Sequence, residues 1–588
     1  MTRKNRAEPS PATVASLRSR GFPPLWLAFA LLLFGVLAYA PTVRVQFIGD
    51  DYIFLDRVRD LDFWGLWSRA HTDFGWYRPW SREFHFWALS RVFGPTELAF
   101  RVGSLVLWFA MLALYRAVLE RDAGARRADI ATLGVASLSL WGVSLTWISG
   151  VQDLWMLVFS LFAVRLDQSR YWRWSVVPYS LALLSKETAV MLPLIVLARA
   201  RIVSRLRWRD AARRLMPLVV VSLAWLVAHP TLVHRLTHSD VQLATGEPPL
   251  PPLHVIGSSL RALVNADQLG GAVDPYAWRP WPTVASALVL AGSAWWALRA
   301  RAGEAAAMPV ANAVRLAAFG AVWCIAGWLP LFSKSVSWHA YYGCLGALGA
   351  WLTLSVPLER MRRVTVGMLL SLGLLRGAAA ATRSWDWGSE WYQTRAGNVL
   401  SVIRRQMHAL YPSLTPHTRV YFGSIPNNIG LIAGQSPALR VWYSDATLEA
   451  GFYSYYRPRG AGEPSGPDLF FHFDSTAGIR EVRDDASPPL GLEPGSDWEQ
   501  DHESLALAFL TSGDRARAAR LFERIAEVPY RVDALMFAGV LWRLEGDSLR
   551  ANDCLAAART RTGRSPAEIA GWAGRLLESM PPARSSAP

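Results

Sequence analysis

Long segments without charged side chains constrain this chain more than any other feature. The first, residues 21–43, has 23 residues and no charge. As a helix rising about 1.5 Å per residue, it is long enough to cross a hydrocarbon core of roughly 30 Å. Several such runs cannot all be buried core helices, so the sequence predicts a protein that crosses the membrane several times. The other uncharged runs are 130–152, 215–228, 281–298, 316–333 and 340–358.

The first run has a second interpretation, a cleaved signal peptide, because Arg18 and Arg20 precede its apolar stretch. The run is long, however, and lacks a convincing small-residue cleavage site. We therefore expect it to remain in the protein as the first span.

The arginines gather in short segments between the apolar runs, at 121–127, 199–214 and 360–363. Such an excess of positive charge is typical of cytoplasmic loops. It explains the net charge of +15 without a nucleic acid partner, and we expect none. Assigning these arginine-rich segments to the cytoplasmic side and fitting the apolar runs between them predicts about eleven spans. The weaker ones lie at 98–119, 154–165, 174–199 (a pair) and 364–381.

The predicted topology is that of a bacterial inner-membrane protein embedded in the lipid bilayer, with a cytoplasmic tail at 1–23 and a membrane domain at 24–381. Outer loops are expected at 44–97 and 233–280, and everything after about residue 382 is expected in the periplasm. Residues 61–67 have a helix-compatible apolar pattern, which favours helices on the membrane surface. A solvated loop is the alternative.

The periplasmic part divides into three predicted regions. Residues 382–460 are expected to form a small α/β segment with strands at 419–423 and 438–443, and the Pro, Gly, Ser and Asp content of 461–497 indicates a linker. In 498–588, Gly-Asp pairs recur 33 residues apart, at 513 and 546. This period is typical of tetratricopeptide-like helical hairpins. Two copies are few, so we expect them to pack on the preceding domain or to bind a protein partner.

The three cysteines, Cys324, Cys344 and Cys554, form no disulfide framework and have no metal-ligand spacing. We expect no redox chemistry.

Directly after the first span, Asp50 and Asp51 place two adjacent carboxylates at the predicted outer surface. Adjacent acids repel, so such a pair can hold a divalent cation such as Mg²⁺ or Mn²⁺, or one member can act as a base on an acceptor hydroxyl. Two adjacent aspartates alone supply too few ligands for a metal. Capping of the following helix is the structural alternative.

Arginine and lysine occur at further predicted outer positions. Arg78 follows Tyr77 among aromatic residues, which favours a phosphate contact beside a sugar-stacking surface; an aromatic belt with a snorkelling arginine is the alternative. Lys186 interrupts an apolar stretch, and ionisable groups at such depth usually face a cavity or a partner. A structural pair between Lys186 and Glu187 is the alternative there.

Three other residues lie at predicted outer turns. Asp153 also has an interpretation as a helix cap. Lys334 and His339 lie in a short outer segment leading to Tyr341, where a lone histidine is more often structural than catalytic. Each signal is weak alone, but the topology puts all of them on one face of the membrane.

With these residues the chain resembles the GT-C class of polytopic glycosyltransferases, which use polyprenyl-phosphate-linked sugars. The likeness is to the branch similar to protein O-mannosyltransferases, with C-terminal tetratricopeptide repeats. The class's acid pair matches Asp50-Asp51, its Tyr-Arg-Pro matches 77–79, and its Gly-x-x-Asp turn is similar to 150–153. Its Leu-Ala-Leu-Leu-Ser-Lys-Glu segment matches 181–187 closely. A tyrosine-rich stretch that commonly begins with arginine is here Trp-His-Ala-Tyr-Tyr at 338–342, a departure that leaves the role of the histidine open.

The resemblance, which covers about residues 25–380, implies a function and residue roles. Asp50 would activate an acceptor hydroxyl and Asp51 would support it or bind a metal, while Arg78 and Lys186 would neutralise the departing lipid phosphate. Negative charge builds on that leaving group, and fixed cations outside water stabilise it. Because the nucleophile enters opposite the phosphate, we expect inversion at the anomeric carbon. Substrate contacts are expected from Tyr77, Asp153, Glu187, His339 and Tyr341.

Two other classes of function stay open. A transporter or flippase for a lipid-linked saccharide would also need cations and aromatic side chains near the membrane surface, together with polar groups deep in several spans and internal repeat symmetry. A non-catalytic membrane scaffold that displays its repeats would need neither the acid pair nor the cations.

Overall fold

The structure, a computed structural model, describes residues 25–72, 75–231, 251–267, 271–300, 308–332, 338–384, 386–425 and 436–579. The tail 1–23, much of the loop 233–280 and Lys334 lie outside these ranges. The chain forms two compact units. The first comprises the residues up to Phe47 together with Val58–Arg395, and the second comprises Ile48–Arg57 together with the residues from Ala396 onward.

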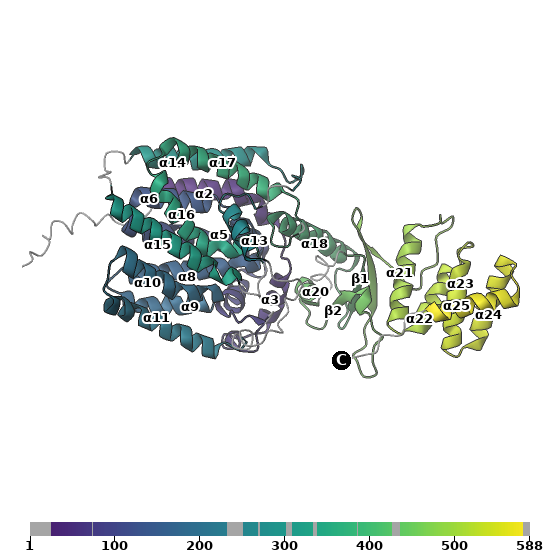
Figure 1. The fold of residues 1–588 in the computed structure, drawn as a ribbon. Helices are drawn as coiled ribbons and strands as arrows, with labels where there is room; N and C mark the ends of the chain where they lie inside the picture. Colours follow the sequence, from purple (N-terminus) through teal and green to yellow (C-terminus); the bar gives the residue numbers. More distant parts are fainter. Residues whose placement is uncertain are drawn as a thin grey trace, which may run out of the picture. The chain divides into compact units, whose positions relative to one another are not determined.

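The first unit is a bundle of helices (Figure 1). Their bounds are α2 (Leu25–Tyr39), α4 (His85–Phe93), α5 (Glu97–Ala123), α6 (Ala125–Ala136), α7 (Trp141–Thr146), α8 (Val151–Asp167), α9 (Val176–Leu183), α10 (Leu192–Ala198), α11 (Trp208–Ala228), α13 (Pro252–Ala262), α14 (Pro280–Ala300), α15 (Val310–Trp328), α16 (Cys344–Leu358) and α17 (Arg362–Ala381). Helix α18 (Glu390–Leu410) begins here and continues into the second unit.

Seven helical segments of the described chain are long and apolar enough to cross a membrane, as expected for a multi-pass membrane protein. They are Leu25–Arg44, Glu97–Ala123, Ile148–Asp167, Trp208–Ala228, Pro280–Arg299, Val310–Phe332 and Arg362–Ala381. The other four predicted spans correspond to α6, α9, α10 and α16, which are helical but have 12, 8, 7 and 15 residues. The count of eleven stays a prediction.

The uncharged run 130–152 is not one continuous helix, which corrects the sequence prediction. Helix α6 ends before α7 begins, and a buried side chain, Asn265, satisfies the backbone at the break. Its amide oxygen accepts the backbone N–H of Ser139 at 2.7 Å, and its amide nitrogen donates to the carbonyls of Ser137 and Leu372 at 2.8 and 2.9 Å. Irregular backbone within an apolar region is tolerated only where such partners exist.

Small residues let α15 and α16 pack closely. A Cβ atom added to Gly327 would lie 2.4 Å from the backbone nitrogen of Gly346, and one added to Gly349 would lie 2.4 Å from the backbone nitrogen of Cys324. Glycine at such positions lets two helix backbones approach within a membrane.

The second unit contains a four-stranded sheet in the order β2-β1-β3-β4. The strands are β1 (Arg419–Gly423), β2 (Glu449–Phe452), β3 (Asp468–Asp474) and β4 (Gly478–Glu481). Strand β1 runs parallel to β2 and β3, while β4 is antiparallel to β3. The predicted strand at 419–423 is confirmed, and all five of its residues are buried.

Two sequence interpretations of this region are wrong. Residues 438–443 were expected as a strand but lie in helix α20 (Ser436–Tyr443), which buries Leu439 and Trp442. Residues 461–497 were expected as a linker but contain β3 and β4. The prolines and glycines of that segment lie outside the apolar centre of β3, where Phe470 and Phe471 are buried beside β1.

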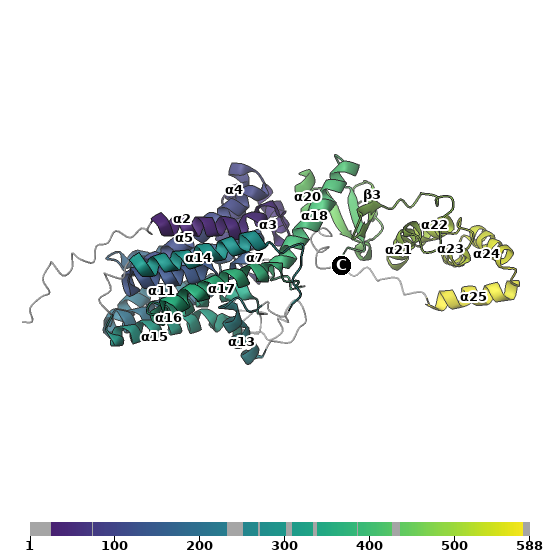
Figure 2. The ribbon, with the colours of Figure 1, turned by 90° about the horizontal axis from the view of Figure 1, so that it is seen from above.

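Helical hairpins follow the sheet, as Figure 2 shows. Their helices are α21 (Asp497–Thr511), α22 (Arg515–Ile525), α23 (Val532–Leu544), α24 (Ser548–Thr562) and α25 (Pro566–Ser579). The repeated Gly-Asp pairs occupy equivalent turns. Gly513 and Gly546 have φ angles of 87° and 85°, and Asp514 and Asp547 cap the helices that follow. The regular spacing of 33 residues therefore reflects a structural repeat, while its membership of the tetratricopeptide class stays a prediction.

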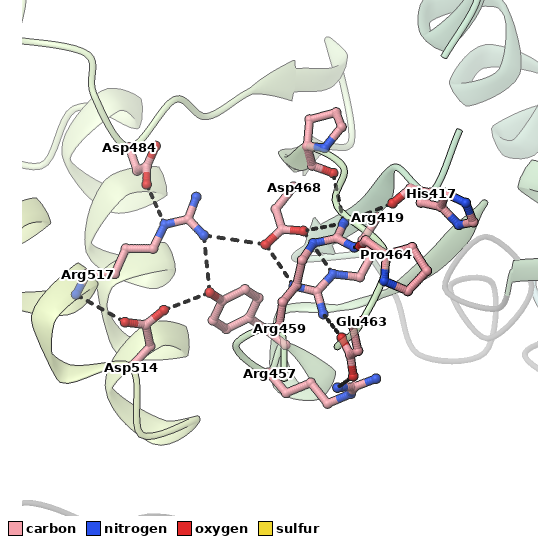
Figure 3. Close-up of polar contacts among 12 residues, drawn as sticks. His417, Arg419, Arg457, Arg459, Glu463, Pro464, Asp468, Asp484, Asp514 and Arg517 are labelled. Carbon is pink, nitrogen blue, oxygen red and sulfur yellow. Dashed lines mark hydrogen bonds and ion pairs between the residues drawn. The ribbon is translucent and has the colours of Figure 1, made fainter. Parts of the chain in front are cut away.

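The hairpins and the sheet share one hydrophobic core, so the repeats pack on the preceding domain. Phe509 of α21 contacts the rings of Tyr456 and Phe470 at centroid distances of 4.9 and 5.2 Å. Figure 3 shows the polar side of this junction. Arg517 of α22 lies 3.5 Å from Asp468 of β3, and its Nη1 donates to the hydroxyl of Tyr456 at 3.1 Å.

Candidate active site

In the first unit, Arg78 forms a buried ion pair with Glu187. Its Nη2 lies 2.6 Å from Glu187 Oε2, its Nε donates to the same carboxylate at 2.8 and 3.0 Å, and its Nη1 donates to Gln152 Oε1 at 2.6 Å. Only 15% of the arginine side chain and 12% of the glutamate side chain are exposed. Because the guanidinium is held internally, the interpretation of Arg78 as a snorkelling arginine is wrong.

Lys186 pairs with Asp153 instead of with its neighbour Glu187. Its Nζ lies 2.6 and 2.7 Å from the two carboxylate oxygens of Asp153, and the two side chains are 5% and 3% exposed. The ammonium also lies over the rings of Tyr341 and Tyr342, 5.4 and 4.7 Å from their centroids. The expected alternatives of a Lys186–Glu187 pair and of Asp153 as a helix cap are both wrong.

Local backbone structure explains why these side chains meet. Helix α9 ends at Leu183, and Lys186 has an extended backbone (φ −162°, ψ 140°) before a 3-10 turn from Glu187 to Met191. The segment around Arg78 docks on this break. Trp80 N–H donates to the carbonyl of Leu184 at 3.2 Å, and the hydroxyl of Ser81 donates to that of Ser185 at 2.7 Å.

The two pairs belong to one cluster of two cations and two carboxylates. Gln152 links them, because it accepts from Arg78 and directly precedes Asp153, and its amide nitrogen donates to Ser149 O at 2.8 Å. Burial acts to lower the pKa of the Arg78 guanidinium, but Glu187, Tyr342 and Asp153 outweigh it and raise the pKa. The arginine is therefore held in its charged form.

Tyr77 and His229 border this cluster. The hydroxyl of Tyr77 donates to the carbonyl of Trp67 at 2.9 Å, and its ring meets the ring of His229 edge-on at 6.1 Å. His229 Nε2 lies 3.9 Å from Glu187 Oε1. Tyr77 thus lies near Glu187, although its predicted contact with substrate stays a prediction.

Tyr341 lies under the Lys186 ammonium, and His339 lies against Tyr341. The ring of His339 stacks on Tyr341 at 6.0 Å and lies 4.3 Å from the ring of Trp387, while His339 Nδ1 lies 3.2 Å from Asp386. Burial raises the pKa of the Asp386 carboxyl, but the hydrogen bond and charge of His339 outweigh it, so that the pKa is lowered.

Asp50 and Asp51 begin helix α3 (Asp50–Arg59) of the second unit. Asp51 is fully buried, and its Oδ2 accepts the backbone N–H of Ile48 at 3.0 Å. This local hydrogen bond holds the backbone just before α3 and does not reach an N–H of its first turn, so the capping interpretation stays a prediction. Asp50 is half-buried. Tyr52 follows in the same helix and accepts a hydrogen bond from Trp442 Nε1 at 3.0 Å.

A metal at the acid pair also stays a prediction. Within the ranges that the structure describes, no group of three or more His, Cys, Asp or Glu side chains is placed to hold an ion. Asp50 and Asp51 could supply two carboxylates, with the remaining ligands coming from water or substrate.

Arg101, a buried residue near the start of α5, was not predicted from the sequence. Its guanidinium donates to carbonyls of residues 45–46 at 3.0 and 3.1 Å, and to carbonyls of residues 145–146. These segments precede the acid pair 50–51 and the turn 150–153 in the chain. An arginine four residues into an apolar helix was the signal that could have indicated it.

Gln152 and Trp387 were also missed. Neither residue type suggests a site from sequence alone, because a single amide or tryptophan near a membrane surface is common. Their neighbours, Arg78 and His339, come from segments 74 and 48 residues away, and only the fold brings them together.

No protein-family model matches this sequence, and no curated protein matches it. Similar solved structures include ArnT from Cupriavidus metallidurans in the apo state, with 14% identity, coverage of 79% of this chain and 94% of that chain, and a TM-score of 0.43. The same protein bound to undecaprenyl phosphate has 15% identity, coverage of 77% and 93%, and a TM-score of 0.37. The Archaeoglobus fulgidus oligosaccharyltransferase in complex with Zn and sulfate has 11% identity, coverage of 72% and 62%, and a TM-score of 0.36. Similarities at this level assign neither a substrate nor a residue role to this chain.

Proposed function

We propose that this chain is a membrane glycosyltransferase that moves a sugar from a polyprenyl-phosphate-linked donor to an acceptor hydroxyl on the outer face, with inversion. The observation that carries the proposal is the buried cluster in which Glu187 and Asp153 hold the two predicted phosphate-binding cations, Arg78 and Lys186. The acceptor, a glycan, lipid or protein hydroxyl, is left open.

The cluster has hydrogen-bond donors to offer a phosphate. A guanidinium has five N–H donors and an ammonium has three. Three donors of Arg78 face Glu187 or Gln152, and two of Lys186 face Asp153. Two donors of Arg78 and one of Lys186 therefore have no hydrogen-bond partner within the described residues, and they could meet an anionic group.

The carboxylates fix the cations before substrate arrives. A buried cation without an anion would be costly, whereas a paired one is held in a single orientation. Charge builds on the phosphate as its bond to the sugar breaks, and donors that are already oriented stabilise this charge without reorganising. Because the cluster of two cations and two carboxylates is neutral, the phosphate would be stabilised by the oriented N–H donors of Arg78 and Lys186 and not by a net positive charge.

Asp50 is the proposed base for the acceptor hydroxyl, with Asp51 shaping the backbone beside it. A carboxylate can accept the proton that an attacking hydroxyl loses. Removal of the proton on one face and departure of phosphate on the other would give inversion.

The test is mass spectrometry of envelope glycans, glycolipids and glycoproteins in a strain that lacks this chain, compared with the same strain complemented by variants. We expect wild type to restore one glycan product, and Arg78→Gln and Lys186→Gln to fail to restore it when the product is normalised to the membrane level of each variant. Arg116→Gln is the matched control, because Arg116 in α5 is also a buried, ion-paired arginine, but its partners are Asp129 and Glu120 and not members of the cluster. Full restoration by both site variants would refute the proposal and favour a scaffold.

A transporter would give a different result. The donor lipid would then accumulate on one face of the membrane in the deletion strain, while transfer in detergent extracts would be unchanged. A glycosyltransferase instead requires that purified wild-type chain consume a polyprenyl-phosphate-linked sugar.

A further inference from the structure

Aromatic rings form a continuous group beside Lys186 in the first unit, made of Trp147, His339, Tyr341, Tyr342 and Trp387, which we call the aromatic shelf. Trp387 meets His339, Trp147 and Tyr341 at centroid distances of 4.3, 5.6 and 6.1 Å. Tyr341 in turn lies 4.4 Å from Tyr342, and Lys186 lies over both tyrosines. The shelf therefore runs without a gap from the proposed phosphate-binding ammonium to Trp387.

The two ends of the shelf differ in exposure. Tyr341 is 2% exposed and lies in the bundle core, whereas Trp387 is 37% exposed. Because Trp387 is partly exposed and packs on buried rings, its indole offers a flat apolar face that a ligand can cover.

A carboxylate borders this open end. The Asp386 side chain is 38% exposed and lies 3.2 Å from His339 Nδ1, and its Oδ1 accepts the backbone N–H of Gly388 at 2.8 Å. These contacts fix the carboxylate next to the exposed ring. Its low pKa keeps it ionised, and an ionised carboxylate accepts strong hydrogen bonds from hydroxyl groups.

We propose that the aromatic shelf binds the pyranose ring of the phosphate-linked donor, with Trp387 covering the apolar face of the sugar and Asp386 accepting hydrogen bonds from its hydroxyls. This inference rests on the proposed function, because it places the sugar next to the phosphate held by Lys186. A pyranose has one face of C–H groups and a rim of hydroxyls, and an aromatic face beside a carboxylate complements both. The shelf would thereby distinguish the glycosylated lipid from the spent polyprenyl phosphate.

The experiment is a competition measured by native mass spectrometry on the purified full chain. Unglycosylated polyprenyl phosphate and the same lipid carrying glucose, mannose or galactose are offered together, and the ratio of the bound species is read directly. We expect wild type to favour one glycosylated lipid by roughly fivefold, the size of one aromatic contact. Trp387→Ala should bring the ratio to about one, while Trp387→Phe should retain part of the preference.

Two further variants distinguish a failure of the aromatic-shelf proposal from a failure of the proposed function. Trp281→Ala is the matched control, since Trp281 is an exposed tryptophan (81%) at the start of α14 that does not belong to the aromatic shelf; it should leave the ratio unchanged. Lys186→Gln should weaken binding of both lipids. If wild type binds neither lipid, or if Lys186→Gln binds both as wild type does, the proposed function itself fails.

The shelf is refuted separately if wild type binds all lipids equally, or if Trp387→Ala keeps the wild-type ratio while both lipids still depend on Lys186. It is also refuted if Trp387→Ala leaves donor binding intact and raises only the KM for the acceptor, because the sugar on the shelf would then belong to the acceptor.

Discussion

The pairing of Lys186 with Asp153 leads to a quantitative prediction about the variants Asp153→Asn, Lys186→Gln and the double variant. The ammonium lies 2.6 and 2.7 Å from both carboxylate oxygens, and both side chains are at least nine-tenths buried. Removing one partner of such a pair costs about 3–5 kcal/mol of stability, because the other charge is left buried alone. Replacing both partners removes that penalty, so the double variant should be more stable than either single variant.

Activity should follow a different pattern. Losing one oriented cation that stabilises the departing phosphate costs about 10²–10³ in rate. In Asp153→Asn the ammonium loses the anion that positions it, so we expect a loss of about 10²-fold, similar to that of Lys186→Gln. Since the two residues act as a unit, the double variant should lose no more than the worse single variant, whereas independent residues would multiply to about 10⁴.

The assay is the amount of the restored glycan product, measured by mass spectrometry in the complemented deletion strain and normalised to the membrane level of each variant. Thermal melting of the purified proteins gives stability in parallel. The reasoning is refuted if Asp153→Asn keeps transfer within threefold of wild type, or if the losses multiply. A double variant that is stable but inactive would show that the loss of transfer is not a loss of folding.

Four further predictions concern other residues. Asp51→Asn should lower the melting temperature, because a neutral amide accepts the Ile48 N–H more weakly, while Asp50→Asn should abolish transfer with normal accumulation; equal transfer by wild type and Asp50→Asn would contradict this. Arg101→Gln should increase hydrogen exchange in residues 45–53 and 145–153 by removing the contacts of Arg101 to the carbonyls of residues 45–46 and 145–146, and unchanged exchange in both peptides would show that Arg101 does not hold these two segments together. The pKa of Asp386 is lowered from 3.8, so its pairing with His339 contributes stability that is complete above about pH 5 and is lost as the pH falls through the lowered pKa. The melting-temperature difference between wild type and Asp386→Asn should therefore shrink below about pH 4; a difference that grows there would contradict the assignment.

The sequence by itself determined the elements that depend on local pattern. Uncharged runs predicted where apolar helices lie, the short apolar stretch at 419–423 before a turn region predicted a strand, and the Gly-Asp pairs located the turns of the hairpins. Each of these signals is carried by neighbouring residues, whose spacing reflects the geometry of a single element. The same local signals failed at 438–443 and 461–497, because a short apolar stretch suits a helix or a strand equally and flanking prolines and glycines concealed β3.

The tertiary structure alone decided which charged groups meet. Lys186 and Glu187 are adjacent in sequence, yet their partners are Asp153 and Arg78, which lie 33 and 109 residues away. No local rule selects among four buried charges, because the choice depends on which helices pack together and on the broken backbone that turns the two side chains apart. The same packing placed Trp387 beside His339. It also brought the Asn265 amide to the break in the span 130–152, where it hydrogen-bonds the backbone. The sequence identified Arg78 and Lys186 as the candidate cations, and the fold determined which carboxylates pair with them.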